Sequence, residues 1–500
     1  MSTLPDPLAL LRSRSYIVLL IIAAIIGAPV SAAAYFFLAL VSELQGWIFT
    51  DLPKGVGFHA EPLWWPILPL LLAGVLVALT IKYLPGKGGH SPADGFKAGA
   101  GPPSPRELPG IVLAALATLS LGVVLGPEAP LIALGGGLGV LAVKLVKRDA
   151  PARTQAAVAA AGSFAAISTL LGSPLTGAFL LMEAAGLGGT MMQVVLVPGL
   201  LAAGVGSLVF VGLNAWTGLG TFSLAIPGLP HVGAPTFGEF GWALAIGLLA
   251  VPFGMGIRWL GLFLRPYVER RMVLFTPLVG LAVAGLAIAF AAGTGKGSSE
   301  VLFSGQSALG PFVDHAASYT VGALVLLLVC KGIAYGVSLS SFRGGPTFPA
   351  LFLGAAGGVA LSHLPGLPLV DGVAMGIAAM SVVMLRLPLT SVLLASLLLA
   401  SDGLAVMPLV IVAVVVAYVL SARLTPSPAT TAPAATGPPP SAGPAAAALQ
   451  PAGPAAAAGR QPAASPAPAT PASPQAAAGP APAPAAPARS ADLPAKSPPS

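Results

Sequence analysis

The sequence predicts an all-helical, polytopic membrane protein that contains two copies of one structural unit. Three observations lead to this fold class. The chain is 56% hydrophobic and 8% charged, with a mean hydropathy of +0.90. Its apolar runs are longer than the core helices of a water-soluble protein need to be. A glycine- and proline-containing motif also occurs twice, and a second repeated triplet follows each copy.

Basic residues gather in the segments that connect the apolar runs, which is typical of cytoplasmic loops. This pattern accounts for the net charge of +7 better than nucleic-acid binding does. These residues are Arg12, Arg14, Lys144, Lys147, Arg148, Arg153, Arg265, Arg270 and Arg271. Cys330 is the single cysteine, so the sequence offers neither a disulfide framework nor a cysteine metal cluster. We therefore expect a multi-pass protein of the cell membrane whose partner is the lipid bilayer, with no nucleic-acid partner, metal or cofactor.

The first apolar run follows two arginines and resembles a secretory signal, but it continues to about residue 41, which is too long. We predict a spanning helix over residues 16–41. Further helices are predicted over residues 65–83, 110–125, 130–146, 153–171, 174–185, 194–213, 240–263, 274–292, 318–337, 349–362, 373–385, 388–400 and 407–422. Segments of about a dozen residues cannot cross a hydrocarbon core of roughly 30 Å, so those meeting at residues 172–174 and 386–388 must pair end to end as broken helices.

The repeated motif is Gly-Pro-x-x-Pro-x-x-x-Leu-Gly, which begins at Gly126 and again at Gly345. A Pro-Leu-Thr triplet follows each copy, at Pro174 and at Pro388. The two copies are separated by 219 residues and the two triplets by 214, so a single duplication accounts for both. We place the halves at about residues 66–215 and 240–422. Gly-Pro is how a helix begins, and a helix start inside a membrane offers free N–H donors that can hold an anion.

Glu128 lies inside the first copy of the motif, between two strongly apolar stretches. A carboxylate at membrane depth is costly and usually faces a transport pathway. The N–H groups of a helix start would stabilise either this carboxylate or an anion, so the two compete for one site. Glu128 is therefore a candidate gate. The alternative is that it only caps its own helix.

Residues 1–424 form the predicted membrane domain, and residues 425–500 consist almost entirely of Ala, Pro, Gly and Ser. Such a composition cannot bury enough apolar surface to fold, so we predict a disordered tail and no folded regulatory domain.

Three motifs together resemble the CLC chloride channel and transporter family. Residues 126–130, Gly-Pro-Glu-Ala-Pro, are similar to its Gly-x-Glu-Gly-Pro motif. Residues 344–349, Gly-Gly-Pro-Thr-Phe-Pro, resemble its Gly-x-Phe-x-Pro region, and residues 86–92 stand where its Gly-Ser-Gly-x-Pro filter belongs. The resemblance implies an inverted-topology repeat, a homodimer with one anion pathway in each subunit, and Glu128 as the gating glutamate. It also implies an anion site formed by Gly89, His90, Ser91, Gly126, Pro127, Ala129, Pro346, Thr347 and Phe348.

The chain departs from the family pattern at several of these positions. Gly89 replaces the coordinating serine of the family, and a hydroxyl follows at Ser91. His90 is either a donor to the anion or an ordinary loop residue. Pro346 has no N–H, which leaves Thr347 as the better ligand, and Phe348 is either a pore-wall residue or part of the core.

Two further departures concern the inner side of the pathway. Gly403 or Leu404 stands where we expect the tyrosine that closes the inner mouth in the family. Ala184 stands where proton-coupled members often carry an inner glutamate, with Glu183 beside it as a candidate proton relay. These losses favour passive conduction of chloride or a similar small anion, with a proton-coupled chloride exchanger as the alternative. A membrane enzyme or a non-transporting scaffold is a more distant alternative, since the apolar segments have no metal-ligand spacing and a scaffold leaves the repeated helix starts unexplained.

Overall fold

The computed structural model describes residues 12–96, 101–186, 189–219, 226, 233, 235–399 and 403–425, with the backbone alone over residues 189–194. All of these residues belong to one compact unit. The tail predicted over residues 425–500 lies outside the described residues, apart from Thr425.

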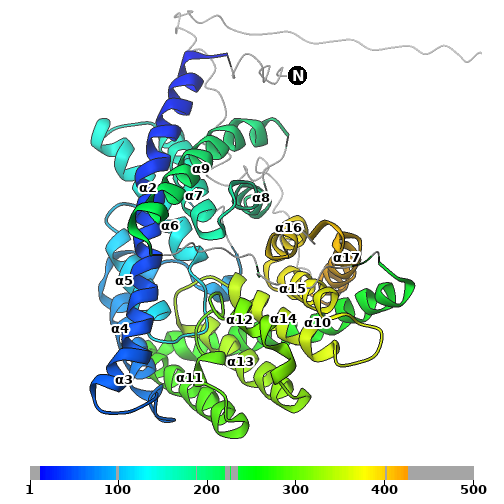
Figure 1. The fold of residues 1–500 in the computed structure, drawn as a ribbon. Coiled ribbons are helices and arrows are strands. Elements are labelled where there is room, and N and C mark those ends of the chain that lie inside the picture. Colours follow the sequence, from blue (N-terminus) through cyan, green and yellow to red (C-terminus); the bar gives the residue numbers. More distant parts are fainter. Residues whose placement is uncertain are drawn as a thin grey trace, which may run out of the picture. The chain divides into compact units, whose positions relative to one another are not determined.

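Helices account for almost all of the described chain, and no strand occurs within it (Figure 1). The long helices are α2 (Arg14–Gly46), α4 (Ile67–Tyr83), α5 (Leu108–Ser120), α6 (Glu128–Val146), α7 (Ala152–Leu171), α8 (Pro174–Ala184), α9 (Gly189–Thr217), α10 (Phe237–Arg270), α11 (Met272–Thr294), α13 (Val321–Ser341), α14 (Thr347–Leu361), α15 (Leu369–Leu385), α16 (Pro388–Leu398) and α17 (Met407–Leu424). Short helices are η1 (Trp47–Asp51), α3 (Leu52–Gly55), η2 (Pro85–Gly88), η3 (Pro92–Asp94), η4 (Ser298–Glu300), α12 (Leu309–Asp314) and η5 (Ala316–Ser318). Eight helices of the described residues are long and apolar enough to cross a membrane. The all-helical, polytopic fold class is confirmed.

The predicted helix breaks occur where the sequence places them. Gly172 ends α7 in the left-handed conformation, with a φ of 63°, and Arg386 ends α15 in the same way, with a φ of 61°. In each half the Pro-Leu-Thr helix, α8 or α16, begins two residues later. Several boundaries were wrong. The helix predicted over residues 110–125 ends at Ser120, because Gly122 turns the chain with a φ of 98°. The helices predicted over residues 16–41 and 240–263 continue to Gly46 and Arg270.

The duplication extends to backbone conformation and packing. Pro127 and Pro346 precede α6 and α14 with nearly identical dihedrals, φ −85° and ψ −1° against φ −90° and ψ −3°. The last glycine of each motif copy lies against the backbone of the next helix. A Cβ at Gly135 would overlap the carbonyl of Gly162 in α7, and one at Gly354 would overlap that of Gly376 in α15. Glycine at these positions lets each helix pair approach closely.

The two copies of the motif meet at the centre of the fold. The N–H of Gly126 donates to the carbonyl of Gly345 at 2.8 Å, and the N–H of Gly345 donates to that of Gly126 at 2.6 Å. This bridge is antiparallel. Two copies of one segment that pair antiparallel run in opposite directions, so the repeat has inverted topology.

Candidate functional site

Glu128 is the first residue of α6, and its side chain is fully buried. Its Oε1 accepts a hydrogen bond from the backbone N–H of Phe348 at 2.9 Å, in the first turn of α14. The carboxylate of one half therefore occupies the helix N-terminus of the other half, where the backbone dipoles stabilise negative charge. This geometry differs from the alternative in which Glu128 only caps its own helix.

The second carboxylate oxygen has a different environment. The Thr347 hydroxyl faces the Glu128 carboxylate, yet Glu128 Oε2 and Thr347 Oγ1 have no hydrogen-bond partner among the described residues. Both atoms are buried, and an unmatched buried carboxylate oxygen is unfavourable unless it carries a proton or moves. The site thus holds Glu128 firmly by one oxygen and weakly by the other.

Glycine provides the room for this carboxylate. A Cβ built on Gly345 would overlap Glu128 Oε2, and one built on Gly126 would meet the same carboxylate. The glycines of the two Gly-Pro steps therefore allow the close backbone approach of the central bridge and leave space for the Glu128 side chain.

Two buried side chains of α13 hold the segments around the bridge, and the sequence analysis missed both. The hydroxyl of Tyr335 donates to the carbonyl of Pro346 at 2.6 Å. One turn earlier, Lys331 Nζ donates to four backbone carbonyls at 3.0 to 3.3 Å and lies 4.5 Å from the centre of the Phe352 ring. These carbonyls belong to residues 300–303, and the N–H of Phe303 donates to the carbonyl of Gly122 at 3.2 Å. The presence of a lysine inside the predicted helix 318–337 was the sequence signal that Lys331 has a buried role.

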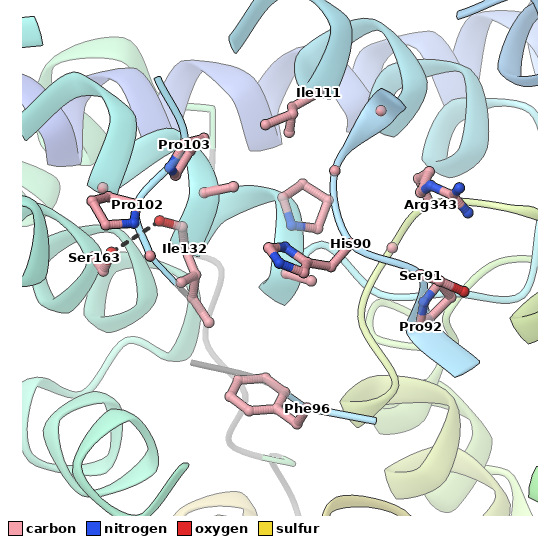
Figure 2. A pocket seen from close by; sticks show the side chains of 18 of the residues that line it. His90, Ser91, Pro92, Phe96, Pro102, Pro103, Ile111, Ile132, Ser163 and Arg343 are labelled. Carbon is pink, nitrogen blue, oxygen red and sulfur yellow. Dashed lines mark hydrogen bonds between the residues drawn. The ribbon is translucent and has the colours of Figure 1, made fainter. Parts of the chain in front are cut away.

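A cavity of about 130 Å³ lies between the predicted filter loop and the start of α6 (Figure 2). Gly89, His90, Ser91, Ala129 and Pro346 all line it, so five of the nine residues predicted to hold the anion share one space. In Figure 2 the His90 ring projects toward the middle of this cavity. Its wall on the other side comes from α6 and α7, where Ser163 Oγ donates to the carbonyl of Ile132 at 3.0 Å.

The remaining predicted site residues do not line this cavity. Gly126, Thr347 and Phe348 surround the Glu128 carboxylate at the bridge, together with Pro127. Phe348 is buried among core residues, and its backbone N–H is the group that donates to the carboxylate. Gly403 is packed against Ser396 of α16, and Leu404 is 75% exposed.

Arg343 also lines the cavity, and the sequence analysis missed it. Its Nε donates to the carbonyl of Lys87 at 3.3 Å, and its Nη1 donates to that of Phe342 at 3.1 Å. The nearby carboxylates of Asp94 and Glu269 both pair with Arg265, and among the described residues no carboxylate pairs with Arg343. Its positive charge is therefore free to attract an anion into the cavity. A charged residue directly before Gly344 and the second Gly-Pro step was the available sequence signal.

A family model described as voltage gated chloride channel matches residues 73–422, which include every helix from α5 to α16. The chain belongs to this family, the CLC family. Its members are transporters of chloride and similar anions in membranes. The resemblance stated from the motifs is thereby confirmed.

Relatives of this CLC chain include proteins named as ion-transport protein YfeO. The one from Salmonella choleraesuis is 29% identical over 383 residues, covering 75% of this chain and 88% of the relative. The one from Escherichia coli O1:K1 is 28% identical over 384 residues, covering 75% and 86%.

Solved structures of similar fold include a slow cyanobacterial Cl⁻/H⁺ antiporter, with a TM-score of 0.67 and 20% identity, covering 81% of this chain and 94% of that one. A CLC-type fluoride/proton antiporter matches with a TM-score of 0.61 and 21% identity, covering 81% and 95%. At these identities the likeness establishes the CLC fold.

Glu183 of this CLC chain lies at the end of α8, and its carboxylate caps α16. Its Oε1 accepts from the N–H of Leu389 at 3.0 Å, and its Oε2 accepts from the N–H and the hydroxyl of Thr390 at 2.7 and 2.6 Å. Both carboxylates that the sequence singles out in the first half thus lie on helix N-termini of the second half. Glu128 does so at α14 and Glu183 at α16.

Proposed function

We propose that this protein transports chloride or a similar small anion across the cell membrane, with Glu128 as the gate. The observation that carries the proposal is the hydrogen bond from the Phe348 N–H to the Glu128 carboxylate, because the same N–H groups are the natural ligands of an anion. While the carboxylate is charged and in place, it blocks the α14 N-terminus. Protonation removes its charge and lets an anion compete for these donors.

The test uses the full chain in liposomes. Wild-type chloride efflux is expected to rise as the pH falls, because protonation releases the gate. Glu128→Gln carries no charge at any pH, so its efflux should be fast and independent of pH. Efflux of Glu128→Gln that keeps the wild-type pH dependence would exclude Glu128 as the gate, and a protein that moves no anion in either form would exclude transport itself.

Proton-coupled exchange is the mode of transport we favour. The proteins of similar fold named above are described as Cl⁻/H⁺ and fluoride/proton antiporters. Glu128 also has one oxygen without a hydrogen-bond partner, and this oxygen is available to accept a proton. The passive conduction favoured by the sequence is the second candidate. It rests on Ala184, which offers no inner carboxylate, and on Glu183, whose oxygens are engaged by α16.

A reversal-potential measurement separates the two modes. Under opposed chloride and proton gradients, an exchanger reverses at a voltage that shifts with the proton gradient, whereas a passive pathway reverses at the chloride equilibrium potential. We also propose that the protein is a homodimer with one pathway in each subunit, which crosslinking in the membrane would test. Gly403 and Leu404 remain the predicted inner mouth, and Glu183 remains the predicted relay.

A further inference from the structure

An open groove of about 610 Å³ lies at one end of α4, outside the anion cavity. Its walls are the end of α4, the short helix η2 and the corner between α10 and α11. It is lined by Ile81, Lys82, Lys87, Glu269, Arg270, Arg271, Met272, Val273 and Leu274. We call it the basic groove, because four of these side chains are cationic and one is acidic.

The charge of the basic groove is largely unneutralised. Glu269 accepts a hydrogen bond from Arg265 Nε at 2.6 Å, so its negative charge already has a partner. Among the described residues, no ion pair involves the four cations Lys82, Lys87, Arg270 and Arg271, and all four are exposed. Several unpaired cations around one concave space favour an anionic ligand with more than one acceptor oxygen, such as a phosphate group.

The groove also adjoins apolar surface that faces lipid. Leu72, Leu76 and Leu79 are exposed on α4, and Leu274 and Leu278 are exposed on α11. These two helices pack against each other, so their exposed side chains continue from the groove toward the membrane centre. Beside the groove, Lys82 Nζ lies 5.0 Å from the centre of the exposed Tyr83 ring, and such aromatic and basic pairs are typical of the membrane interface.

The distribution of charge identifies the leaflet. The segments at the opposite ends of α4, α10 and α11 carry three acidic residues, Glu61, Glu239 and Glu300, and two cations, Lys54 and Lys296. The excess of Lys and Arg at the groove end therefore places it in the cytoplasm by the positive-inside rule, and the cytoplasmic leaflet is where anionic lipids attract basic segments.

We propose that the basic groove binds the headgroup phosphate of an anionic phospholipid, whose acyl chains lie along α4 and α11. The groove reaches the anion cavity through Lys87. This residue has a φ of 50°, directly precedes Gly88 and Gly89, and accepts the Nε–H of Arg343 on its carbonyl. A headgroup on the Lys87 side chain thus holds the loop that lines the cavity. This second step rests on the proposed function, whereas lipid binding itself does not.

Binding is tested by native mass spectrometry on the full chain purified in detergent, with phosphatidylglycerol or phosphatidylcholine added. The variant Lys82→Gln/Arg270→Gln/Arg271→Gln removes three cations from the groove. The control Lys144→Gln/Lys147→Gln/Arg148→Gln removes three cations from the last turn of α6 and the loop that follows it. We expect the wild type and the control to retain phosphatidylglycerol and the groove variant to lose at least roughly tenfold in retention. Equal retention by the groove variant, or equal retention of phosphatidylcholine by the wild type, would overturn the proposal.

A second arm distinguishes a lipid from free phosphate. Inorganic phosphate is added to the wild type without lipid, and thermal stability is compared with that in phosphatidylglycerol. Stabilisation by phosphatidylglycerol and not by phosphate supports a lipid site, whereas equal stabilisation by both makes this a site for free phosphate. Efflux from liposomes with and without phosphatidylglycerol then tests the link through Lys87. If the groove variant loses lipid binding but responds to phosphatidylglycerol as the wild type does, the link fails while lipid binding and transport stand.

Discussion

At the residue scale, the site depends on individual buried side chains and on glycines that leave room for them. Glu128 binds the Phe348 N–H because Gly126 and Gly345 leave room for a carboxylate beside the bridge. Arg343 brings an unpaired positive charge to the wall of the neighbouring cavity. Both features fit the proposed anion pathway, since a carboxylate held by one oxygen can be displaced and a fixed positive charge lowers the barrier for an anion to enter.

We expect Gly345→Ala to displace the gate, because the added methyl group would take the place of Glu128 Oε2. Losing a hydrogen bond to a charged group costs about 1.5–3 kcal/mol, so efflux at neutral pH should rise by roughly tenfold or more. Chloride efflux from liposomes at several pH values checks this. Gly357→Ala in α14, the helix that follows Gly345, is the control, because its methyl group would meet open space. Efflux of Gly345→Ala that stays low and rises with acid as in the wild type would contradict this role of glycine.

We expect Arg343→Gln to slow anion entry on the order of tenfold at low ionic strength, because it removes the fixed charge of the cavity. The defect should shrink in concentrated salt, where charges are screened. Initial rates of chloride efflux at two ionic strengths measure both effects. Arg343→Lys keeps the charge and should restore most of the rate. A loss that Arg343→Lys fails to restore, or that is equal at both ionic strengths, would mean that Arg343 acts through packing.

At the scale of elements, helix N-termini of the second half are capped by carboxylates of the first half. Glu183 donates nothing and accepts three hydrogen bonds from the start of α16, where the first N–H groups of a helix otherwise lack partners. Lys331 acts in the opposite sense, because its ammonium group donates to four carbonyls of residues 300–303. Both side chains connect elements that are distant in sequence.

We expect Glu183→Gln to lower the free energy of unfolding by about 1 kcal/mol, because an amide caps α16 less well than a carboxylate does. Thermal unfolding in detergent measures this. Glu43→Gln, an exposed change in α2, is the control and should have no effect. A variant with unchanged stability that loses proton movement during chloride flux would instead support the predicted relay.

We expect Lys331→Ala to lower the free energy of unfolding by at least about 3 kcal/mol, because four carbonyls lose a buried cation. Methylammonium fits the space of the missing ammonium group and should recover part of this loss. Unfolding temperatures with and without methylammonium provide the measurement. Lys296→Ala, two residues after the end of α11, is the control and should be insensitive to methylammonium. Lys331→Ala as stable as the wild type would show that the carbonyls find other partners.

At the scale of the whole molecule, the two halves are held together at their shared centre. The bridge between Gly126 and Gly345, the Glu128 contact to α14 and the Glu183 contact to α16 all join one half to the other. The helices α4 and α11 also pack across this boundary. Neither half contains a complete site, because the Glu128 carboxylate comes from the first half and the Phe348 N–H that it binds comes from the second.

We expect residues 1–232 and 233–500, produced together as separate chains, to purify as one complex and to transport chloride. Each half alone should fail to give a monodisperse protein, because its central polar groups lose their partners. Gel filtration and efflux from liposomes test this. A half that is folded and stable by itself would show that the halves at about residues 66–215 and 240–422 do not depend on each other for their central polar groups.

Much of the fold follows from local pattern. Each of the helix breaks at residues 172–174 and 386–388 ends in a proline that begins the next helix. Gly172 takes the left-handed conformation at the first break without steric cost, whereas Arg386 takes it at the second. The position of Glu128 at a helix start follows from the Gly-Pro step before it. The roles of Arg343 and Lys331 were not predicted, because a charged residue in an apolar run indicates a function but does not show which groups the side chain contacts. Gly403 and Leu404 were placed by motif alignment, and sequence carries no information on how far a loop lies from a cavity.

The sequence by itself determined that the protein is helical, spans a membrane, contains a duplication and carries one carboxylate at a helix start in the first motif copy. These properties depend on composition and on spacing along the chain. Tertiary structure alone decided that the two copies pair antiparallel, that Glu128 lies on the helix of the opposite half, and that Arg343 lines the cavity. Such contacts join residues about 220 positions apart, Glu128 and Phe348 among them, and no local preference of the backbone encodes them.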